Sequence, residues 1–398
     1  MRKAAQAGAS LMFINSVDYA YTFKVAHKAI VTPSRLVQSL AGVAAALLQS
    51  KKARAPQALQ SVIDQTLPDA TEQAMASALS EAGQASVLLG LGAGMHPAFS
   101  TLRALAVLIA GLSGAKLGFL SDGANSAGAC LAGVLPHRTA GGQVRENPGL
   151  NAAQMIDQPL KNYLLLGIEP EFDFANGAQA LAAMQQAELV VALTPYMTDR
   201  MREYADVLLP INCFSETSGT FVNCEGRWQS FAAVSRAPAG SRPGWKVLRV
   251  LGKLLELDGF SQTSSQQLRD SLSQLIGDVT VNNTHCGEFV GYLESSGGLQ
   301  RIDYLPMYAV DSMVRRATAL QKTPDADVAS VCLNPADASR LGLSDGDKAV
   351  VLQGDEDADM DVVVNDSIAE GSVLISQAIE TTLELGAAFG SVQIKKAS

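Results

Sequence analysis

Short apolar runs alternate with helical segments between residue 83 and about residue 232. The runs are ASVLLGLGAG (85–94), AKLGFLS (115–121), NYLLLGIEP (162–170), ELVVALTPY (188–196) and ADVLLP (205–210). Continuous apolar runs of this length are typical of parallel strands that helices cover on both faces. The pattern therefore predicts a doubly wound, Rossmann-like α/β domain. In such sheets ligands bind beyond the carboxyl ends of the strands.

The residues before and around this pattern suggest two domain limits. Residues 1–80 contain an apolar run (10–15) and a helical segment (32–50), and we expect them to be the end of a truncated α/β domain. Residues 81–257 are then the Rossmann-like domain, which includes a hairpin at 215–231.

The last third of the chain changes character twice. Residues 258–326 are rich in serine and glutamine and lack apolar periodicity, so we predict a linker or insertion. In residues 327–398, Asn334 is placed to begin a short helix and Gly342 to end it. Strands are expected at 348–353, 361–364 and 372–376. These features predict a small, barrel-like β domain.

Composition excludes two classes of partner. The net charge is −9, the four histidines are scattered and no basic run is present, which argues against nucleic-acid binding. The longest apolar run, Ala104–Ala115, has twelve residues and is flanked by Arg103 and Lys116. A helix of that length spans about 18 Å, whereas the hydrocarbon core of a bilayer is roughly 30 Å thick. We therefore predict no membrane-spanning helix.

The cysteines show no metal-binding spacing. No CxxC pair exists among Cys130, Cys213, Cys224, Cys286 and Cys332. This spacing argues against a structural zinc site, a disulfide framework and a conventional iron–sulfur ligand set, and it favours reduced thiols of the cytoplasmic kind. His285 and Cys286 are adjacent, but no second pair accompanies them, so no metal site is predicted. His96 and His137 each neighbour a proline and are expected to be surface or capping residues.

Two glycine-rich stretches follow predicted strands. Gly90, Gly92 and Gly94 resemble a dinucleotide-binding turn, but the third glycine comes one place too early and no acid stands about twenty residues later. Glycine can equally serve to turn the chain tightly into the next helix. The second stretch, GANSAGA (123–129), sets Asn125 among small residues, which permit close approach of either a ligand or a neighbouring helix.

The segment 215–231 has the pattern of a hairpin. GTFVN and RWQSF alternate like strands, and Gly226 between them supplies the positive φ of a tight turn. A structural hairpin would pack Phe221 and Trp228 onto the edge of the sheet; a binding hairpin would present polar residues to a ligand. Glu216 and Glu225 are both candidates to pair with Arg227 and orient its guanidinium group.

Four blocks together resemble the molybdopterin oxidoreductase superfamily. ADVLLPINCFSETSGTFVNCEGRWQ (205–229) resembles the pattern A-D-V-x-L-P, an acid before S/G-T, and N-x-E-G-R-x-Q. GANSAGACLAGVLPHR resembles the N-x-x-G-A stretch, and YLLLGIEP resembles the strand before Asn-Pro. VCLNPADASRLGLSDGDKAVV (331–351) resembles the C-terminal dinucleotide-binding domain, which implies a double-psi β-barrel. The blocks occur in the order of the family and cover nearly the whole chain.

Two further segments resemble one branch of that superfamily. AGVLPHRTAGG (132–142) and DYLPMYAVDSMVRRATALQKTPDA (303–326) are similar to the G subunit, the large peripheral-arm subunit of bacterial NADH-quinone oxidoreductase (respiratory complex I). In that protein the iron–sulfur clusters lie in an N-terminal portion rich in CxxC spacings, which this chain lacks. The resemblance therefore implies a C-terminal piece whose iron–sulfur part is missing.

That branch is understood to have kept the fold and lost the pterin, and residues 1–50 supply no Cys or Ser metal ligand in the expected context. The resemblance thus implies a cofactor-free structural and assembly module without catalytic residues of its own. Its partners would be the other peripheral-arm subunits, on the cytoplasmic side of the inner membrane. The matched positions that could bind a cofactor are then vestigial, and they are Gly90, Gly92, Asn125, Asn223, Glu225 and Arg227.

Two alternatives remain open from the sequence. The first is a fragment of an active molybdopterin-guanine-dinucleotide oxidoreductase of the formate or nitrate type, in which Asn223 and Arg227 would contact phosphate or pterin. The second is a stand-alone nucleotide-binding protein that uses Gly90 to Gly94.

Overall fold

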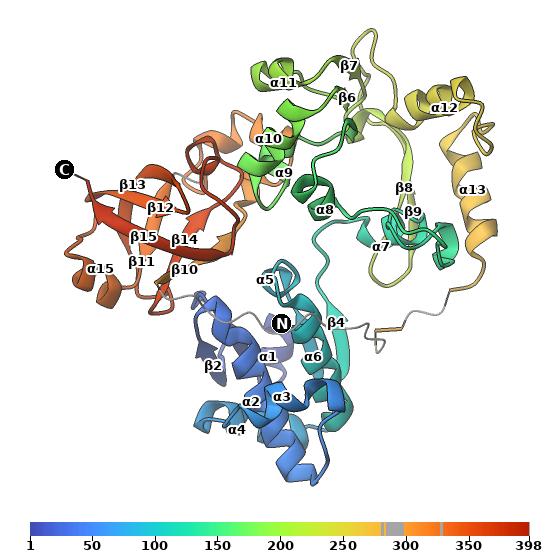
Figure 1. Cartoon of the computed structure of the whole chain (residues 1–398). Helices are drawn as coiled ribbons and strands as arrows, with labels where there is room; N and C mark the ends of the chain where they lie inside the picture. The colour runs from blue at the N-terminus through green and yellow to red at the C-terminus, as the bar shows by residue number, and fades with distance from the viewer. Residues whose placement is uncertain (280–281, 284–297, 327–328, 398) are drawn as a thin grey trace. The chain divides into compact units, whose positions relative to one another are not determined.

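The chain folds into two compact units (Figure 1). The computed structural model describes residues 1–279, 282–283, 298–326 and 329–397. Unit 1 consists of Met1–Leu120, Asn282–Leu305 and Val328–Ser398, and unit 2 consists of Ser121–Val281 and Pro306–Asp327. The expected domain limits at residues 80 and 257 do not coincide with the limits of these units.

Unit 1 begins with two separate parallel strand pairs and a layer of helices. Strand β1 (Met12–Asn15) pairs with β2 (His27–Ile30), and β3 (Ser86–Leu89) pairs with β4 (Lys116–Phe119). The layer consists of α2 (Leu36–Lys51), α4 (Ala70–Glu81) and α6 (Phe99–Ser113). In α2 the buried residues Val37, Ala41, Ala44 and Leu48 recur at helical spacing, so one stripe faces the core. Short helices connect these elements: α1 (Arg2–Gln6), η1 (Pro33–Arg35), η2 (Gln57–Leu59), α3 (Gln60–Asp64) and α5 (Leu91–Gly94).

A buried carboxylate sets how closely α2 and α4 approach. Asp69 and Glu72 form a capping box at the start of α4, with N–H to oxygen distances of 2.8 and 3.0 Å. Glu72 is 6% exposed, and it lies against Gly42 of α2. A Cβ atom at Gly42 would lie 2.0 Å from Oε2 of Glu72. A side chain at position 42 would therefore have to displace the Glu72 carboxylate, which the capping box holds in place.

Replacing Gly42 tests this contact. Although alanine is the better helix former, Gly42→Ala should lower the free energy of unfolding by about 1–3 kcal/mol, because the new methyl group overpacks the buried Glu72. A Cβ at Gly111 of α6 would meet nothing within 4 Å, so Gly111→Ala should instead raise stability by about 0.5–1 kcal/mol. Urea unfolding of both variants checks the pair, and equal stabilisation by both would contradict the contact.

The second part of unit 1 is a closed six-stranded barrel. Its strands in order around the barrel are β10 (Leu299–Tyr304), β14 (Ser372–Ser376), β11 (Ser330–Leu333), β13 (Glu356–Val364), β12 (Lys348–Gln353) and β15 (Gly390–Lys396), which pairs again with β10. Helix α15 (Pro335–Leu341) begins at Asn334, whose side chain accepts the Ala336 amide, and it ends at Gly342 with φ +68°. The predicted barrel-like domain and both helix limits are confirmed. The prediction fails at β10, which lies inside the expected linker.

Unit 2 contains a three-stranded parallel sheet in the order β5 (Asn162–Leu166), β6 (Leu189–Thr194), β7 (Val207–Pro210). Helices α8 (Ala152–Asp157), α9 (Pro170–Asp173), α10 (Gly177–Gln186) and α11 (Asp199–Tyr204) accompany it. Tyr163, Leu165, Met184, Val190 and Met201 form much of its core. All the strands predicted between 83 and 210 exist, but they fall into two sheets in different units rather than into one doubly wound sheet.

Unit 2 also contains a hairpin formed by β8 (Gly219–Val222) and β9 (Trp228–Phe231). Helices α7 (Ser126–Leu131) and α13 (Ser265–Ile276) both contact β8 (Figure 1). The remaining elements are η3 (Ala140–Gly142), η4 (Phe214–Glu216), α12 (Gly244–Leu254), η5 (Met307–Ala309), α14 (Ser312–Arg315) and η6 (Leu320–Lys322), with η7 (Glu380–Thr382) in unit 1.

Residues 258–326, which the sequence predicts as a linker or insertion, contain helix α13 (Ser265–Ile276). Ser264 begins this helix by accepting the Gln267 amide at 3.2 Å. No helix in the described part of the chain is long and apolar enough to cross a membrane.

Candidate functional site

A buried ionic cluster lies at the carboxyl end of β5. Glu169, which is 1% exposed, accepts a hydrogen bond from Nε of Arg315 at 3.0 Å and pairs with Arg316 through its other oxygen. Arg315 also binds Asp173 at 2.9 Å. The arginines come from the 312–316 segment, more than 140 residues further along the chain. The cluster therefore fastens that segment to the strand ends of the unit 2 sheet.

Aromatic residues complete this cluster. Arg316 lies over the ring of Tyr196, 4.8 Å from its centroid, and Tyr196 directly follows the β6 end. The Cys213 sulfur and the Tyr196 hydroxyl lie 3.5 Å apart, and a hydrogen bond between them, together with burial, raises the pKa of Tyr196 to about 12. The side chain is thus a neutral phenol at physiological pH. Strand ends from β5, β6 and β7 therefore meet in one polar constellation.

A second buried acid lies in the same α9 turn. Glu171 is 2% exposed; burial raises its pKa, and its Oε1 has no hydrogen-bond partner among the described residues. The hydroxyl of Tyr204 donates to its Oε2 at 3.4 Å. Burial and the neighbouring Glu171 raise the pKa of Tyr204 as well. Tyr204 is therefore held beside the buried Glu171 as a neutral phenol.

The sequence interpretation missed the residues of this cluster. The available signal was an acidic stretch, EPEFD (169–173), directly after an apolar strand, and an Arg-Arg pair at 315–316. Nothing in the spacing shows that the two stretches meet.

Removing the buried carboxylate should be costly. Glu169→Gln leaves two guanidinium groups beside a neutral amide, so we expect the free energy of unfolding to fall by about 3–5 kcal/mol. Glu188 forms an ion pair with Lys161 in which the two side chains are 65% and 78% exposed. Glu188→Gln should therefore change stability by about 0–1 kcal/mol. Denaturant titration compares the two, and a loss below 1 kcal/mol for Glu169→Gln would show that the cluster does not hold unit 2 together.

The second polar constellation of unit 2 is the hairpin. Asn125 accepts the backbone N–H of Val222 at 2.8 Å, which joins the predicted GANSAGA loop to β8. A Cβ at Gly128 would lie 2.0 Å from Oδ1 of Asn125, so the small residue there leaves room for this bond. Asn223 in turn accepts the amides of Glu225 and Arg227 at 3.1 and 2.9 Å. The structure thus brings together four of the six predicted site residues.

The guanidinium of Arg227 has no ion-pair partner among the described residues, and its side chain is exposed. The expected pairing with Glu216 or Glu225 is wrong, because the Glu216 carboxylate accepts the Cys213 amide at 3.0 Å and the Glu225 carboxylate lies 3.5 Å from the Asn223 amide nitrogen. The Glu216 carboxylate thus contacts the backbone three residues earlier, and the Glu225 carboxylate contacts a side chain of its own turn.

The aromatic residues of the hairpin pack differently from the expectation. The rings of Phe221 and Phe231 meet edge to face at 4.9 Å. Strands β8 and β9 form a sheet of their own and pair with no other described strand. The hairpin therefore does not extend the edge of the parallel sheet. Asn125 and the neighbouring helices position it instead.

The remaining two predicted residues, Gly90 and Gly92, belong to unit 1. They stand at the start of α5 and line a cavity of about 280 Å³. Gly90 has φ −88°, and a Cβ at either position would meet nothing within 4 Å. Neither backbone strain nor crowding among the described residues demands glycine there. A ligand-binding role for these two residues stays a prediction.

The predicted metal and thiol residues are mostly accounted for. His285 and Cys286 lie outside the described residues. His137 is exposed, whereas His96 is buried rather than superficial, and its Nδ1 accepts the Ala98 amide at 3.0 Å. The four described cysteines are free thiols. Within the described ranges no group of three or more His, Cys, Asp or Glu side chains is arranged to hold a metal ion.

The cavity of unit 1 also contains polar atoms without partners. Asp303 of β10 lines it, and burial raises the pKa of Asp303 to about 7 despite the opposing charge of Arg301. Oδ1 of Asp303 and Oγ of Ser16, another lining residue, have no hydrogen-bond partner among the described atoms. Arg301 itself donates to Gln353 at 2.9 Å, and burial lowers its pKa to about 10.

Asp303 should make stability depend on pH. Because its pKa is raised in the folded state from 3.8 to about 7, the folded chain binds more protons in that window and loses stability as the pH rises through it. Asp303→Asn removes this dependence, so the unfolding free energy of the variant relative to the unsubstituted chain should climb with a slope of up to about 1.4 kcal/mol per pH unit. Urea titrations from pH 4 to pH 8 measure the slope; parallel pH curves would refute the burial of this acid.

Comparisons with known proteins match both parts of the chain. The family model described as "Molybdopterin oxidoreductase" matches residues 1–254, and "Molydopterin dinucleotide binding domain" matches residues 302–391. The G subunit of NADH-quinone oxidoreductase from Mycobacterium bovis is 31% identical over 155 residues, which cover 33% of this chain and 19% of that protein. Nitrate reductase of Synechocystis sp. is 25% identical over 142 residues, or 34% of this chain and 20% of that protein. The matched stretches thus span about a fifth of these relatives.

A solved structure supports the fold over the whole chain. Acetylene hydratase from Pelobacter acetylenicus superposes with a TM-score of 0.64 at 12% identity, covering 99% of this chain and 75% of that one. At this identity the similarity concerns the fold alone.

These matches contradict the expectation that the chain holds no cofactor. Both matched families point to a molybdopterin cofactor in this chain. The expectation rested on the missing metal ligand in residues 1–50. A pterin dinucleotide, however, also offers bases, ribose and phosphates, which bind to residues far from the metal.

Proposed function

Because the chain belongs to the molybdopterin oxidoreductase family, we propose that it is the cofactor-holding portion of an oxidoreductase subunit. The unused guanidinium of Arg227 is the single observation that carries this proposal. A planar guanidinium offers donors that match the oxygens of a phosphate, and the cofactor's dinucleotide arm contains a diphosphate. Arg227 is thus the group that we assign to the phosphates.

The hairpin supports this assignment by its rigidity. Asn223 fixes both backbone amides of the turn, and Gly226 adopts φ +78° there. Asn125 ties the neighbouring strand to α7 through the Val222 amide. A group held on such a turn loses little conformational freedom on binding, which favours affinity.

A buried acceptor provides the complementary chemistry for a base. Oδ1 of Asn212, two residues beyond the β7 end, is buried and has no partner among the described residues. A buried acceptor without a partner costs about 1–3 kcal/mol. The amino and imino groups of a pterin or guanine are donors that would satisfy such acceptors. Arg227 and Asn212, both of unit 2, therefore fit the organic part of the cofactor.

The separate roles of the cofactor and the protein follow from this fit. When bound, the cofactor supplies the redox chemistry, while the protein supplies binding, orientation and electrostatics. Arg227 would neutralise phosphate charge, and Asn212 would accept a hydrogen bond from an N–H group of a base.

We infer that the oxidoreductase is a multi-subunit complex related to NADH-quinone oxidoreductase, with the chain in the position of its G subunit and peripheral to the membrane on the cytoplasmic side. The identity of 31% to the Mycobacterium bovis protein, against 25% to the nitrate reductase, supports this class. Residues 303–326, which resemble the G subunit, also contain the two arginines that hold the Glu169 cluster. The alternative is an active enzyme of the formate or nitrate type.

Arg227→Ala tests the phosphate assignment. The chain is produced in a bacterial host that makes molybdopterin dinucleotide, and pterin retained per polypeptide is measured by fluorescence after oxidative release. Loss of one charge-assisted contact should weaken binding by about 10- to 100-fold. Arg236→Ala, which removes another exposed arginine, should retain pterin like the unsubstituted chain.

Failure of the Arg227 assignment can be distinguished from failure of the proposed cofactor binding. Equal retention by Arg227→Ala and Arg236→Ala would refute the role of Arg227. Absence of pterin from the unsubstituted chain as well would refute cofactor binding by this chain.

A further inference from the structure

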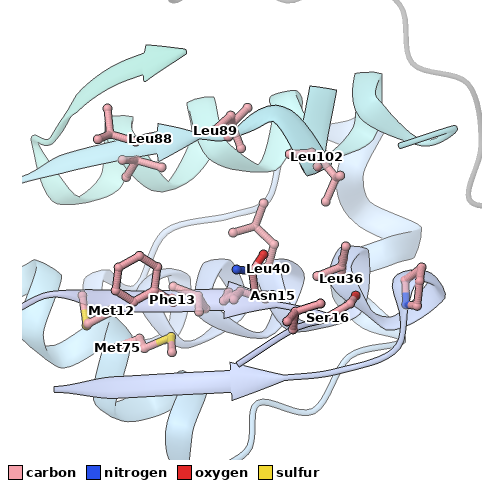
Figure 2. A pocket seen from close by; sticks show the side chains of 18 of the residues that line it. Met12, Phe13, Asn15, Ser16, Leu36, Leu40, Met75, Leu88, Leu89 and Leu102 are labelled. Carbon is pink, nitrogen blue, oxygen red and sulfur yellow. The ribbon is translucent and has the colours of Figure 1, made fainter. Parts of the chain in front are cut away.

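Two strand edges in unit 1 face the same cavity. Strand β1 pairs with β2 along one edge, and β3 pairs with β4 along one edge. The other edge of β1 and the other edge of β3 have no described partner. The cavity of about 280 Å³ is lined by consecutive residues of both strands, 12–17 and 86–89. Consecutive residues belong to opposite faces of a strand, so the cavity runs along the strand edges and not over one face. Figure 2 shows this space between β1 and β3.

The backbone groups along these edges point into the cavity. Ala85 and Leu89 accept amides of the β4 segment through their carbonyls, so the intervening Ser86 and Leu88 direct their backbone groups to the opposite side. In the same way Asn15 accepts the Val31 amide beside β2, and Ile14 is therefore directed away from β2. Leu88 is 50% exposed, which is unusual for a leucine within a parallel sheet.

The directions of side chains and backbone groups in the two strand pairs are those expected of one parallel sheet. In β1, Met12 and Ile14 pack their side chains on the helix layer and direct their backbone groups away from β2, into the cavity. In β3, Val87 packs on the same layer and directs its backbone groups toward β4. In one parallel sheet, the helix-facing residues of every strand direct their backbone groups to the same side. Both strands meet this condition with the cavity between them.

The width of the helix layer agrees with one additional strand. Helix α4 contacts β2, α2 contacts β1, and α6 contacts β3 and β4; α2 also packs on both other helices. Three helices at 8–10 Å spacing span roughly 16–20 Å between their outer axes. Five strands at about 4.8 Å span roughly 19 Å, whereas four span about 14 Å. The width of the layer therefore matches a five-stranded sheet better than a four-stranded one.

We propose that an apolar β-strand of four to six residues (roughly the length of β1 and β3) inserts between β1 and β3, parallel to both. The strand comes from polypeptide outside residues 1–398, in the part of this fold that the chain does not cover: a quarter of the acetylene hydratase chain has no counterpart here. Its helix-facing side chains would contact Leu36, Leu40 and Leu102, which surround the space in Figure 2. Such a strand would be apolar on both faces, as central parallel strands are.

An added strand tests the proposal in the 398-residue chain. The segment Val-Thr-Val-Ile-Val is joined to Met1 by a Gly/Ser linker of about twenty residues, which has an end-to-end distance of roughly 25 Å. We expect a higher midpoint of thermal unfolding, and hydrogen exchange slowed by at least about 100-fold at the amides of Ile14, Ser86 and Leu88. The same extension with Asp at its alternate positions is the matched control and should produce neither effect.

Two proline substitutions in β3 test which of its backbone N–H groups point into the cavity. Leu88→Pro removes an N–H that points into the cavity, so it should cost the unextended chain little, since edge strands tolerate proline on the free side. It should nevertheless abolish the gain from the added strand. Val87→Pro removes an N–H directed at β4 and should destabilise the chain with or without the extension.

Several results would overturn the proposal. Slow exchange of Ile14, Ser86 and Leu88 in the unextended monomer would mean that the edges are already paired, and this measurement decides the question even if the extended chain fails to fold. Equal behaviour of the apolar and Asp-containing extensions would exclude strand insertion. Protection that appears only with concentration, together with a dimeric mass, would assign the edges to a second copy instead.

Discussion

Glu169 places a carboxylate, 1% exposed, at the carboxyl end of β5, and two guanidinium groups from residues 312–316 neutralise it. A buried charge left alone costs several kcal/mol, so the strand end and the distant segment are held to one another. The same arginines lie over Phe172 and Tyr196. In this way one buried charge fixes the strand-end row of unit 2, where α/β sheets carry their ligand-binding groups.

Local features of the fold could be predicted from the sequence because their causes are local. Asn334 and Gly342 limit a helix by capping and by positive φ, and the apolar runs form the strands. The pairing of the strands, in contrast, could not be predicted from local features. An apolar run reports that a strand is buried, but β3–β4 and β5–β7 have the same kind of run and lie in different sheets. Helix α13 escaped prediction because its serine and glutamine residues resemble those of a linker.

The candidate site shows the same limit. Asn125 and Asn223 were singled out from the sequence, and both hold the hairpin through backbone amides. The partner of Arg227 was wrong because proximity in sequence does not decide where a carboxylate finds its donors. The Glu169 cluster was missed because its members are 146 and 147 residues apart. The absence of a metal ligand in residues 1–50 gave no information on the parts of a pterin that bind elsewhere.

Several hydrogen-bonding groups without described partners are consistent with a chain that binds a ligand. Among the described residues of unit 2, Arg227 offers donors without an acceptor and Asn212 offers an acceptor without a donor. In unit 1, β1 and β3 each present a backbone edge without a described partner. The most direct measurement of cofactor holding is the native mass of the chain, purified from a host that makes molybdopterin dinucleotide. We predict a species heavier than the 41.7 kDa polypeptide by the mass of the cofactor, and loss of the excess on denaturation. A mass equal to that of the bare polypeptide under both conditions would contradict cofactor binding by this chain.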